Sequence, residues 1–355
     1  MRDLYAHSIA LIRAHQSDGG AYVASPTFAT YNYCWFRDGT YIAYAMDLVG
    51  QHASARRFYD WAAAMVARRA DAVERAIVAA PQGQPAPADL LDTRYTLDGA
   101  VGDDDWPNFQ LDGFGTLLWG MRQHLALGDA ALPEHWRTAA DLLARYLGAL
   151  WRLPCYDCWE EFGDKVHTAT LAALYGGLNA AAALLDEPRH AQAAAEIKQF
   201  VLSSCVNGTS LSKFVGSALV DASLVHVATP YRLLEPEDPL MRATIARIEA
   251  ELRRNDGGVH RYADDSYYGG GEWLLLTAYL GWYYVECGAT ARARELLDWV
   301  ERNASSAGDM PEQVAANLNH PEMLAAWNAR WGTSASPLLW SHAAYLTLHS
   351  LLHSQ

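Results

Sequence analysis

The chain of 355 residues is longer than a single ordinary hydrophobic core requires, and 51% of its residues are hydrophobic, so we expect either two domains or one large closed repeat architecture. Its 27 basic and 41 acidic residues give a formal net charge of −14, which argues against nucleic acid and anionic membrane surfaces as partners. No apolar run reaches the length of a membrane span, and charged residues interrupt the N-terminal segment where a signal peptide needs an unbroken apolar core, so we expect a cytoplasmic protein.

Apolar residues recur at helical spacing along most of the chain, and no alternating, strand-like segments appear between these stretches. The pattern predicts about twelve helices, near residues 3–16, 38–50, 52–78, 112–127, 132–150, 166–185, 188–204, 220–228, 238–253, 271–287, 289–304 and 338–353.

The connections between these helices alternate in length. They are short after every even-numbered helix and long after every odd-numbered one, and the long ones cover residues 17–37, 79–111, 151–165, 205–219, 254–270 and 305–337. Six helical hairpins connected in this way form a ring of inner and outer helices with all long loops at one end. The sequence therefore predicts an all-α fold, an (α/α)6 barrel that occupies residues 1–355 as a single domain. We interpret the Pro- and Gly-rich segment 81–92 as a loop at the rim of this barrel and not as a domain linker.

The first long connection ends in YNYCWFRDGTY (residues 31–41), where aromatic residues surround the adjacent Arg37 and Asp38. Such a pair is either a satisfied ion pair of the core or a polar clamp beside a stacking platform for a sugar ring. The segment alone leaves both interpretations open.

Four further long connections carry similar side chains. Their segments are VGDDDWPNFQLDG (101–113), PCYDCWEEFGD (154–164), RYADDSYYGGGEW (261–273) and DMPEQ (309–313). Together they bring tryptophans, tyrosines, carboxylates and an arginine to one end of the predicted barrel. A pocket lined in this way suits a neutral polyhydroxylated ring, because aromatic faces cover its C–H surface and charged groups take its hydroxyls in pairs.

The five cysteines have no disulfide framework spacing, and the pair Cys155 and Cys158 has no second pair or histidine set with which to bind a metal. The chain also lacks a phosphate loop and a dinucleotide fingerprint. We therefore expect reduced thiols, no metal and no cofactor.

The loop segments resemble the successive signature segments of glycoside hydrolase family 15, the glucoamylases and their relatives. The similar segments are YNYCWFRD, DDDWPNFQLDG, YDCWEEF, RYADDSYYGGGEW and PEQ followed by SPLLWSHA, in the family's order and across nearly the whole chain. The resemblance implies an (α/α)6 barrel, in agreement with the helix count, and inverting hydrolysis of α-glucosidic bonds from the non-reducing end.

Hydrolysis of an acetal requires protonation of the leaving oxygen and attack by water, so two carboxyl groups must face each other across the sugar. By resemblance, Glu160 is the general acid, Glu312 is the general base, and Glu161 binds the leaving sugar. Without the resemblance, Glu160 and Glu161 also fit a solvated helix start, and Glu312 also fits an acid in the first turn after Pro311.

The resemblance also implies a set of sugar-binding residues. Arg37 and Asp38 grip the hydroxyls at the far end of the terminal glucose, which explains exo action, while Tyr31 and Trp35 lie near the attacking water and the ring. The other residues predicted to bind substrate are Trp106, Asp157, Trp159 and Arg261.

The chain has no room for the additional sandwich domain or starch-binding module of many relatives, so we expect short imported α-glucosides as substrates, with isomaltose first. Trehalose and maltose-type oligosaccharides stay open. Two alternatives come from other classes: a sugar epimerase or isomerase, which would depend on histidine bases, and a sugar-binding protein without catalysis.

Overall fold

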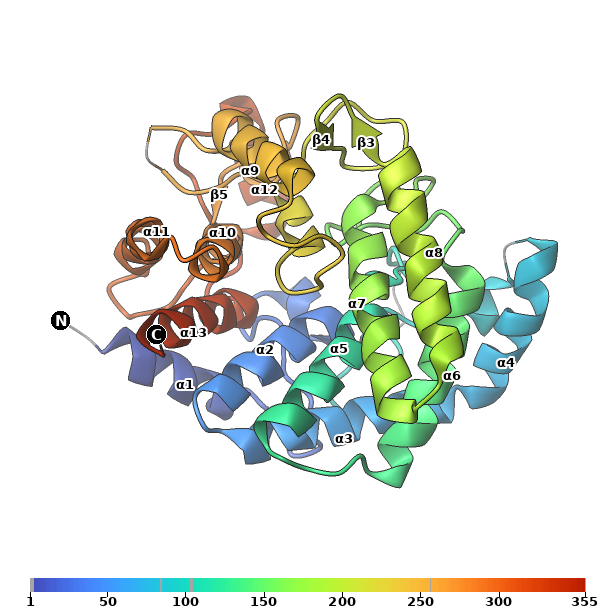
Figure 1. Cartoon of the computed structure of the whole chain (residues 1–355). Helices are drawn as coiled ribbons and strands as arrows, with labels where there is room; N and C mark the ends of the chain where they lie inside the picture. Colours follow the sequence, from blue (N-terminus) through green and yellow to red (C-terminus); the bar gives the residue numbers. More distant parts are fainter. Residues whose placement is uncertain (1–2, 84, 103–104, 256, 355) are drawn as a thin grey trace.

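Six helical elements form a closed inner ring in the computed structural model, which describes residues 3–83, 85–102, 105–255 and 257–354 (Figure 1). Each element contacts the next along the chain, and the last contacts the first. In order they are α2 (Phe36–Leu48), α5 (Asp112–Leu127), α7 (Thr168–Leu185), the 3-10 helix η4 (Ala222–Val227), α10 (Leu274–Glu286) and α13 (Leu339–His353).

Each inner element contacts an outer helix that comes from the same part of the chain or, for α13, from the opposite terminus. The outer helices are α1 (Leu4–Ala14), α3 (His52–Arg68), α6 (Glu134–Leu150), α8 (Pro188–Ser204), α9 (Pro239–Leu252) and α11 (Thr290–Arg302). This arrangement confirms the predicted (α/α)6 barrel.

The inner and outer positions follow from composition. Eleven of the 13 residues of α10 are buried, against five of 13 in the neighbouring outer helix α11. A helix that is apolar on all sides is stable only inside a ring, whereas an amphipathic helix covers it from outside. Helix α7 is long and apolar enough to pass a length-and-composition test for a membrane span, contrary to expectation, but it packs between α5 and α8 as a core helix.

The structure differs from the predicted helices in three places. The first, 52–78, is two helices, α3 and α4 (Ala70–Ala79), because Arg69 leaves the helical conformation at φ −105° and ψ 12°. The Arg69 guanidinium donates to the carbonyls of Ala88 and Leu90 at 2.8 and 3.0 Å. The break therefore ties the rim segment 81–92, with its 3-10 helices η2 (Ala80–Gln82) and η3 (Pro87–Asp89), to the helices of the barrel.

The second difference is the fourth inner element, which is a 3-10 helix and not an α-helix. Asp221 caps it by accepting a hydrogen bond from the backbone N–H of Ser223, and Pro230 follows closely after its end. A residue before proline avoids the helical conformation, so this element stays short.

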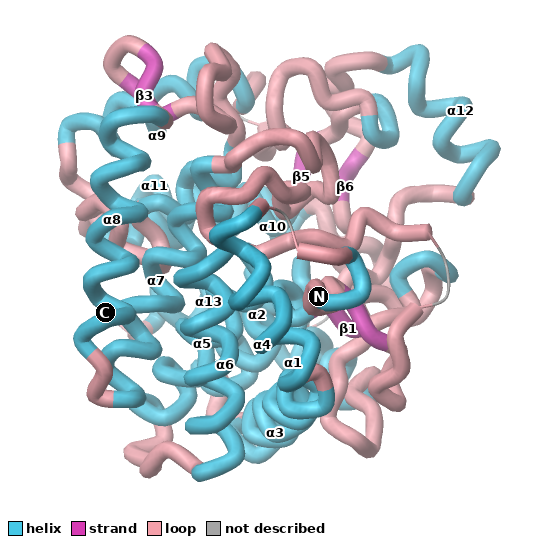
Figure 2. The backbone as a smooth tube through the Cα atoms, turned by 90° about the vertical axis from the view of Figure 1, so that its right-hand side faces the viewer, coloured by secondary structure: helices cyan, strands magenta, loops and turns pink. Residues whose placement is uncertain are grey.

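The third difference is an additional helix, α12 (Pro321–Trp331), within the last long connection. None of its residues is fully buried, so no apolar stripe announces it in the sequence. It packs against the 3-10 helix η5 (Tyr267–Gly269) and lies at the outer edge of the loop side of the molecule (Figure 2).

Short antiparallel strand pairs brace the long loops, and two of these pairs join one loop to another. β1 (Cys34–Trp35) pairs with β2 (Arg94–Tyr95), and β5 (Glu272–Trp273) pairs with β6 (Gln313–Val314). A third pair joins β3 (Val206–Asn207) and β4 (Ser210–Leu211). The first two pairs fix the segments that carry Trp35 and Glu312 relative to their neighbours, and thereby position the site described next.

Candidate active site

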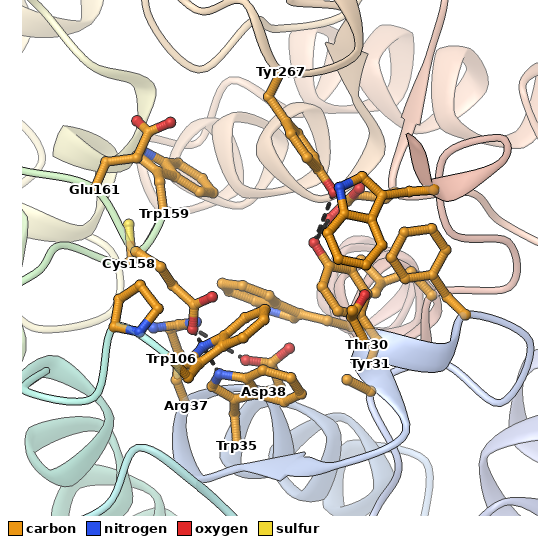
Figure 3. Close-up of a pocket in the computed structure, with 18 of the residues that line it drawn as sticks. Thr30, Tyr31, Trp35, Arg37, Asp38, Trp106, Cys158, Trp159, Glu161 and Tyr267 are labelled. Carbon is orange, nitrogen blue, oxygen red and sulfur yellow. Dashed lines mark hydrogen bonds and ion pairs between the residues drawn. The ribbon is translucent and has the colours of Figure 1, made fainter. Parts of the chain in front are cut away.

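A cavity of about 480 Å³ opens among the long loops. Ten of the eleven residues predicted as catalytic or substrate-binding line it: Tyr31, Trp35, Arg37, Asp38, Trp106, Trp159, Glu160, Glu161, Arg261 and Glu312. Figure 3 shows Trp35, Arg37, Asp38 and Trp106 on one side of this cavity and Tyr31 with Tyr267 on another. Segments far apart in the sequence therefore meet at one place. Residues 103 and 104 of the second loop segment lie outside the described residues.

Glu160 projects into the cavity from a tight turn, residues 157–162, which we call the Glu160 turn. Its carboxyl oxygen Oε1 accepts hydrogen bonds from Trp35 Nε1 at 2.7 Å and from Gln110 Nε2 at 3.0 Å. Both donors are neutral and both use the same oxygen. The carboxyl group is thus aimed by groups from the first and second long loops.

Asp157 is the one predicted substrate-binding residue that does not line the cavity, so that prediction is wrong. Its side chain is buried beneath the Glu160 turn, where Oδ1 accepts the backbone N–H groups of Trp159 at 2.9 Å and Glu161 at 3.0 Å. Burial alone would raise the pKa of Asp157, but Lys213 and His167 lower it below its ordinary value. Asp157 is a carboxylate that supports the turn.

Glu312 is buried in the same cavity and is surrounded mainly by neutral groups. Oε1 accepts from the Tyr31 hydroxyl at 3.0 Å, and Oε2 accepts from Ser334 Oγ at 3.3 Å. The Tyr31 oxygen lies 2.9 Å from the hydroxyl oxygen of Tyr267. Burial raises the pKa of Glu312 to about 7, although the hydrogen bond from Tyr31 and the charge of Arg261 oppose the rise.

The segment that carries Glu312, residues 310–314, is called the Glu312 segment below. The N–H of Met310 donates to His342 Nε2 at 2.9 Å, and Ser341 Oγ donates to the carbonyl of Pro311 at 2.9 Å. His342 Nδ1 in turn lies 2.8 Å from Ser8 Oγ, and burial lowers the pKa of His342 to about 3, so the ring is neutral. Helix α13 therefore fixes this segment without a charged partner.

Arg37 and Asp38 lie in the first turn of helix α2 and both line the cavity, which decides between the two interpretations of this pair. Arg37 Nε lies 3.4 Å from Asp38 Oδ2, and Arg37 Nη1 donates to Gln110 at 3.0 Å and Asp112 at 3.2 Å. Burial raises the pKa of Asp38 to about 6 against the opposing charge of Arg37. The pair is a fixed polar edge of the cavity and not a closed ion pair of the core.

Glu161 and Arg261 form a second polar edge. Arg261 Nη2 donates to Glu161 Oε1 at 3.3 Å, and the Tyr262 hydroxyl donates to Oε2 at 2.6 Å. The guanidinium carbon also lies 5.2–5.4 Å from the ring centres of three aromatic residues that line the cavity, Trp159, Tyr267 and Trp273. These rings and the buried ion pair with Asp265 hold Arg261 in the wall of the cavity.

Sequence reasoning missed several lining residues. Tyr267 and Trp273 stand inside a quoted segment, but that segment offered no reason to select them among its aromatics. Trp327, Arg330 and Trp331 lie on α12, which was not predicted. Cys158 of the CYDC motif also lines the cavity, but burial raises its thiol pKa well above the ordinary value, as expected of a reduced thiol.

Comparisons with known proteins give consistent results. A profile of the family described as "Glycosyl hydrolases family 15" matches residues 1–350. Isomaltose glucohydrolase of Kribbella flavida is 44% identical over 98% of this chain and 92% of its own length. Trehalase 1 of Sulfolobus acidocaldarius is 27% identical over 76% of this chain and 49% of its own.

Solved structures agree. A structure named as a wild-type glycosidase superposes with a TM-score of 0.95 at 43% identity, covering 99% of this chain and 96% of the other. A bacterial glucoamylase complexed with acarbose superposes with a TM-score of 0.75 at 20% identity, covering 98% of this chain and 55% of the other, which shows a shared fold.

Proposed function

The chain belongs to glycosyl hydrolases family 15, and on that premise we propose that it is an exo-acting α-glucosidase that hydrolyses isomaltose and related short α-glucosides with inversion, releasing β-glucose. The observation that carries the proposal is the meeting of Glu160 and Glu312 in one aromatic cavity, each with its own hydrogen-bond donors. Two carboxyl groups in different environments are what acid- and base-assisted hydrolysis of an acetal requires.

In this proposal Glu160 protonates the oxygen of the leaving sugar and Glu312 takes a proton from the attacking water. The Tyr31 hydroxyl, which lies 3.0 Å from Glu312, orients the base and its water. A carboxyl group with a pKa of about 7 is a competent base near neutral pH, because its proton affinity matches the conditions under which it works.

The terminal glucose is held at the edge formed by Arg37 and Asp38. Gln110 and Asp112 fix Arg37, which in turn pairs with Asp38, before substrate arrives, so little conformational entropy is lost on binding. Trp35 and Trp106, whose ring centres are 6.0 Å apart, cover the apolar faces of the sugar. A grip on the far hydroxyls leaves no space for a chain that continues beyond them, which makes the action exo.

The leaving sugar is assigned to the second polar edge. Glu161 is held by Arg261 and Tyr262, and Trp159 stands beside it in the wall of the cavity. Helix α12 adds Trp327, Arg330 and Trp331 farther out. Support for an α-1,6-linked disaccharide comes from the relative at 44% identity.

A panel assay tests the proposal. Purified protein is incubated with isomaltose, maltose, nigerose, kojibiose and trehalose, and glucose release is measured. The highest kcat/KM is expected for isomaltose, and proton NMR of a fresh digest is expected to show β-glucose before any α-glucose. Early α-glucose contradicts inversion, and a preference for trehalose or maltose contradicts the proposed substrate without affecting the assignment of the family.

A further inference from the structure

Lys213 is a buried cation outside the cavity that the proposed reaction does not use. The chain has only three lysines, at positions 165, 198 and 213, and Lys213 is 3% exposed. A buried ammonium group is costly unless it is paired and hydrogen-bonded. Its place in this structure therefore calls for a physical reason.

The ammonium group lies between two buried carboxylates. Its Nζ is 3.0 Å from Asp157 Oδ2 and donates a short hydrogen bond to Asp221 Oδ2. Both aspartates are less than 5% exposed. Burial would lower the pKa of Lys213, but the charges of Asp221 and Asp157 raise it above its ordinary value, so the lysine is cationic.

Each carboxylate supports a part of the cavity. Asp157 accepts the backbone N–H groups of Trp159 and Glu161 on either side of Glu160. Asp221 accepts the indole N–H of Trp159, with Nε1 at 3.1 Å from Oδ2 and 3.2 Å from Oδ1. Lys213 thus connects the support of the Glu160 turn with the support of the Trp159 wall.

The turn needs such support because its backbone is strained. Glu160 has φ +65° and Phe162 has φ +51°, in the left-handed region that residues other than glycine avoid. Residues held there persist only where their surroundings fix them. Hydrogen bonds in both directions close the turn, from Glu160 N to Asp157 O at 2.9 Å and from Asp157 N to Glu161 O at 3.1 Å.

The backbone of Lys213 is itself anchored. Its N–H donates to Leu219 O at 2.8 Å, and its carbonyl accepts the N–H of Thr168 at the start of α7 at 3.1 Å. The ammonium group also lies 4.0 Å from the ring centre of Tyr262, whose hydroxyl holds Glu161. The lysine therefore links the turn to an inner helix of the barrel.

We propose that Lys213 is a positioning residue for Glu160, acting through Asp157 to hold the Glu160 turn in the conformation that points its carboxyl group at the leaving oxygen. Lys213 does not contact the cavity, so it is not a catalytic residue. The inference rests on the proposed function of Glu160 as the general acid.

The test compares two substrates in the same variants. Isomaltose has a poor leaving group that needs a proton from Glu160, whereas α-glucosyl fluoride releases fluoride with little need for acid assistance. Both substrates use the same grip on glucose and the same base. The ratio of their kcat/KM values therefore reports on the acid together with the leaving-sugar edge, which only isomaltose fills, and general damage to the fold does not move it; the position of the Glu160 turn in crystal structures of the variants separates the two.

Lys213→Met is expected to lower kcat/KM for isomaltose by roughly 10²-fold, the size of effect that a misplacement of about 1 Å produces, and to lower it for the fluoride by less than about threefold. Lys213→Arg keeps the cation and is expected to restore most of the isomaltose activity. Asp157→Asn removes the charge that faces Lys213 but keeps an oxygen for the two N–H groups, and roughly a tenfold loss with isomaltose alone is expected. If Lys213→Met does not fold, these two milder variants carry the test.

Asp47→Asn is the matched control, because Asp47 is also buried and paired, with His124 at 2.9 Å, but lies at the other end of α2 from Arg37. It is expected to lower stability and leave the ratio unchanged. Crystal structures of the Lys213 variants should show the Glu160 turn displaced. Equal losses on both substrates, no loss, or an undisplaced turn would overturn the proposal. A wild-type protein inactive on both substrates would overturn the proposed function instead, and the displaced or undisplaced turn would still decide the role of Lys213.

Discussion

The Glu160 turn and the Glu312 segment bring the same type of side chain to one cavity by different means. The Glu160 turn has two non-glycine residues in the left-handed region and rests on a buried cluster of charges, Lys213 with Asp157 and Asp221. The Glu312 segment is fixed by neutral partners, among them His342 and Ser341.

This contrast shows where charged groups can support such a site without disturbing it. Beneath the Glu160 turn the charges are paired with one another away from the cavity, so they support the backbone without competing for substrate. Around Glu312 a direct cationic partner would lower the pKa of the carboxyl group and weaken it as a base. With neutral donors, burial dominates and raises that pKa to about 7. In the proposed reaction, these different environments are what assigns the two glutamates to two tasks.

The largest effects are expected from removal of either carboxyl group. Glu160→Gln and Glu312→Gln should each lower kcat on isomaltose by roughly 10²–10⁴-fold while the protein stays folded, because each group acts in the transition state. The comparison is sharpened with α-glucosyl fluoride: Glu160→Gln should keep much of its activity on this substrate and Glu312→Gln should not. Equal losses in both variants on both substrates would contradict the assignment of acid and base.

The polar edge formed by Arg37 and Asp38 should respond differently from the Glu160 turn and the Glu312 segment. Arg37→Ala or Asp38→Asn is expected to lower kcat/KM by about 10²-fold or more on every α-glucoside and on the fluoride alike, since the gripped hydroxyls belong to the glucose that all of them share. Steady-state kinetics over the disaccharide panel measures this. A loss confined to one linkage would place the pair on the leaving-sugar side.

Tyr31→Phe removes the hydroxyl that donates to Glu312 at 3.0 Å. We expect kcat to fall by about 10²-fold on isomaltose and by a similar factor on the fluoride, because the base is affected and the acid is not. Tyr267→Phe removes the hydroxyl beside that of Tyr31, which contributes less than Tyr31 to the environment of Glu312, and is the comparison variant with a smaller expected loss. A loss on isomaltose alone in Tyr31→Phe would connect Tyr31 with Glu160 instead.

Much of this site could be predicted from the sequence, because its segments are local. The residues of a short segment such as WFRD or WEEF are neighbours in the chain, so they lie together in the structure. The alternation of short and long connections places these segments at one end of the barrel. The direction of Asp157 could not be predicted, since it depends on Lys213, which is 56 residues away in the chain. Helix α12 was missed because no buried stripe marks it, so its tryptophans had no predicted element to carry them.

The pH dependence of activity tests whether burial sets the pKa of Glu312, which distinguishes the Glu312 segment from the Glu160 turn. Glu312 must be ionised to act as a base, and burial raises its pKa to about 7, so kcat/KM should fall about tenfold for each pH unit below 7. Since the Tyr31 hydrogen bond lowers the pKa of Glu312, Tyr31→Phe should move this limb to higher pH. A profile of kcat/KM against pH that stays flat from pH 7 to pH 5 would show that the base has an ordinary pKa and that burial does not set it.

The smallest effect concerns stability, and it has the opposite sign to the effect on activity. The pKa of Glu312 is raised from 4.5 to about 7 on folding, so the folded protein holds this proton more tightly than the unfolded chain. The stabilising contribution is complete below the unfolded pKa and is lost as the pH rises through 7, where the buried carboxylate costs about 3 kcal/mol.

Glu312→Gln removes that charge, so at pH 8 the inactive variant should unfold at a higher temperature than the wild type, and at pH 5 the difference should shrink to less than about 1 kcal/mol. Thermal unfolding at the two pH values measures this, with Glu134→Gln as a control at a carboxyl group that is 86% exposed and expected to show almost no change. A Glu312→Gln variant that is less stable at pH 8 would show that the hydrogen bonds of the carboxylate outweigh the cost of its burial, and the two segments would then differ less than the structure indicates.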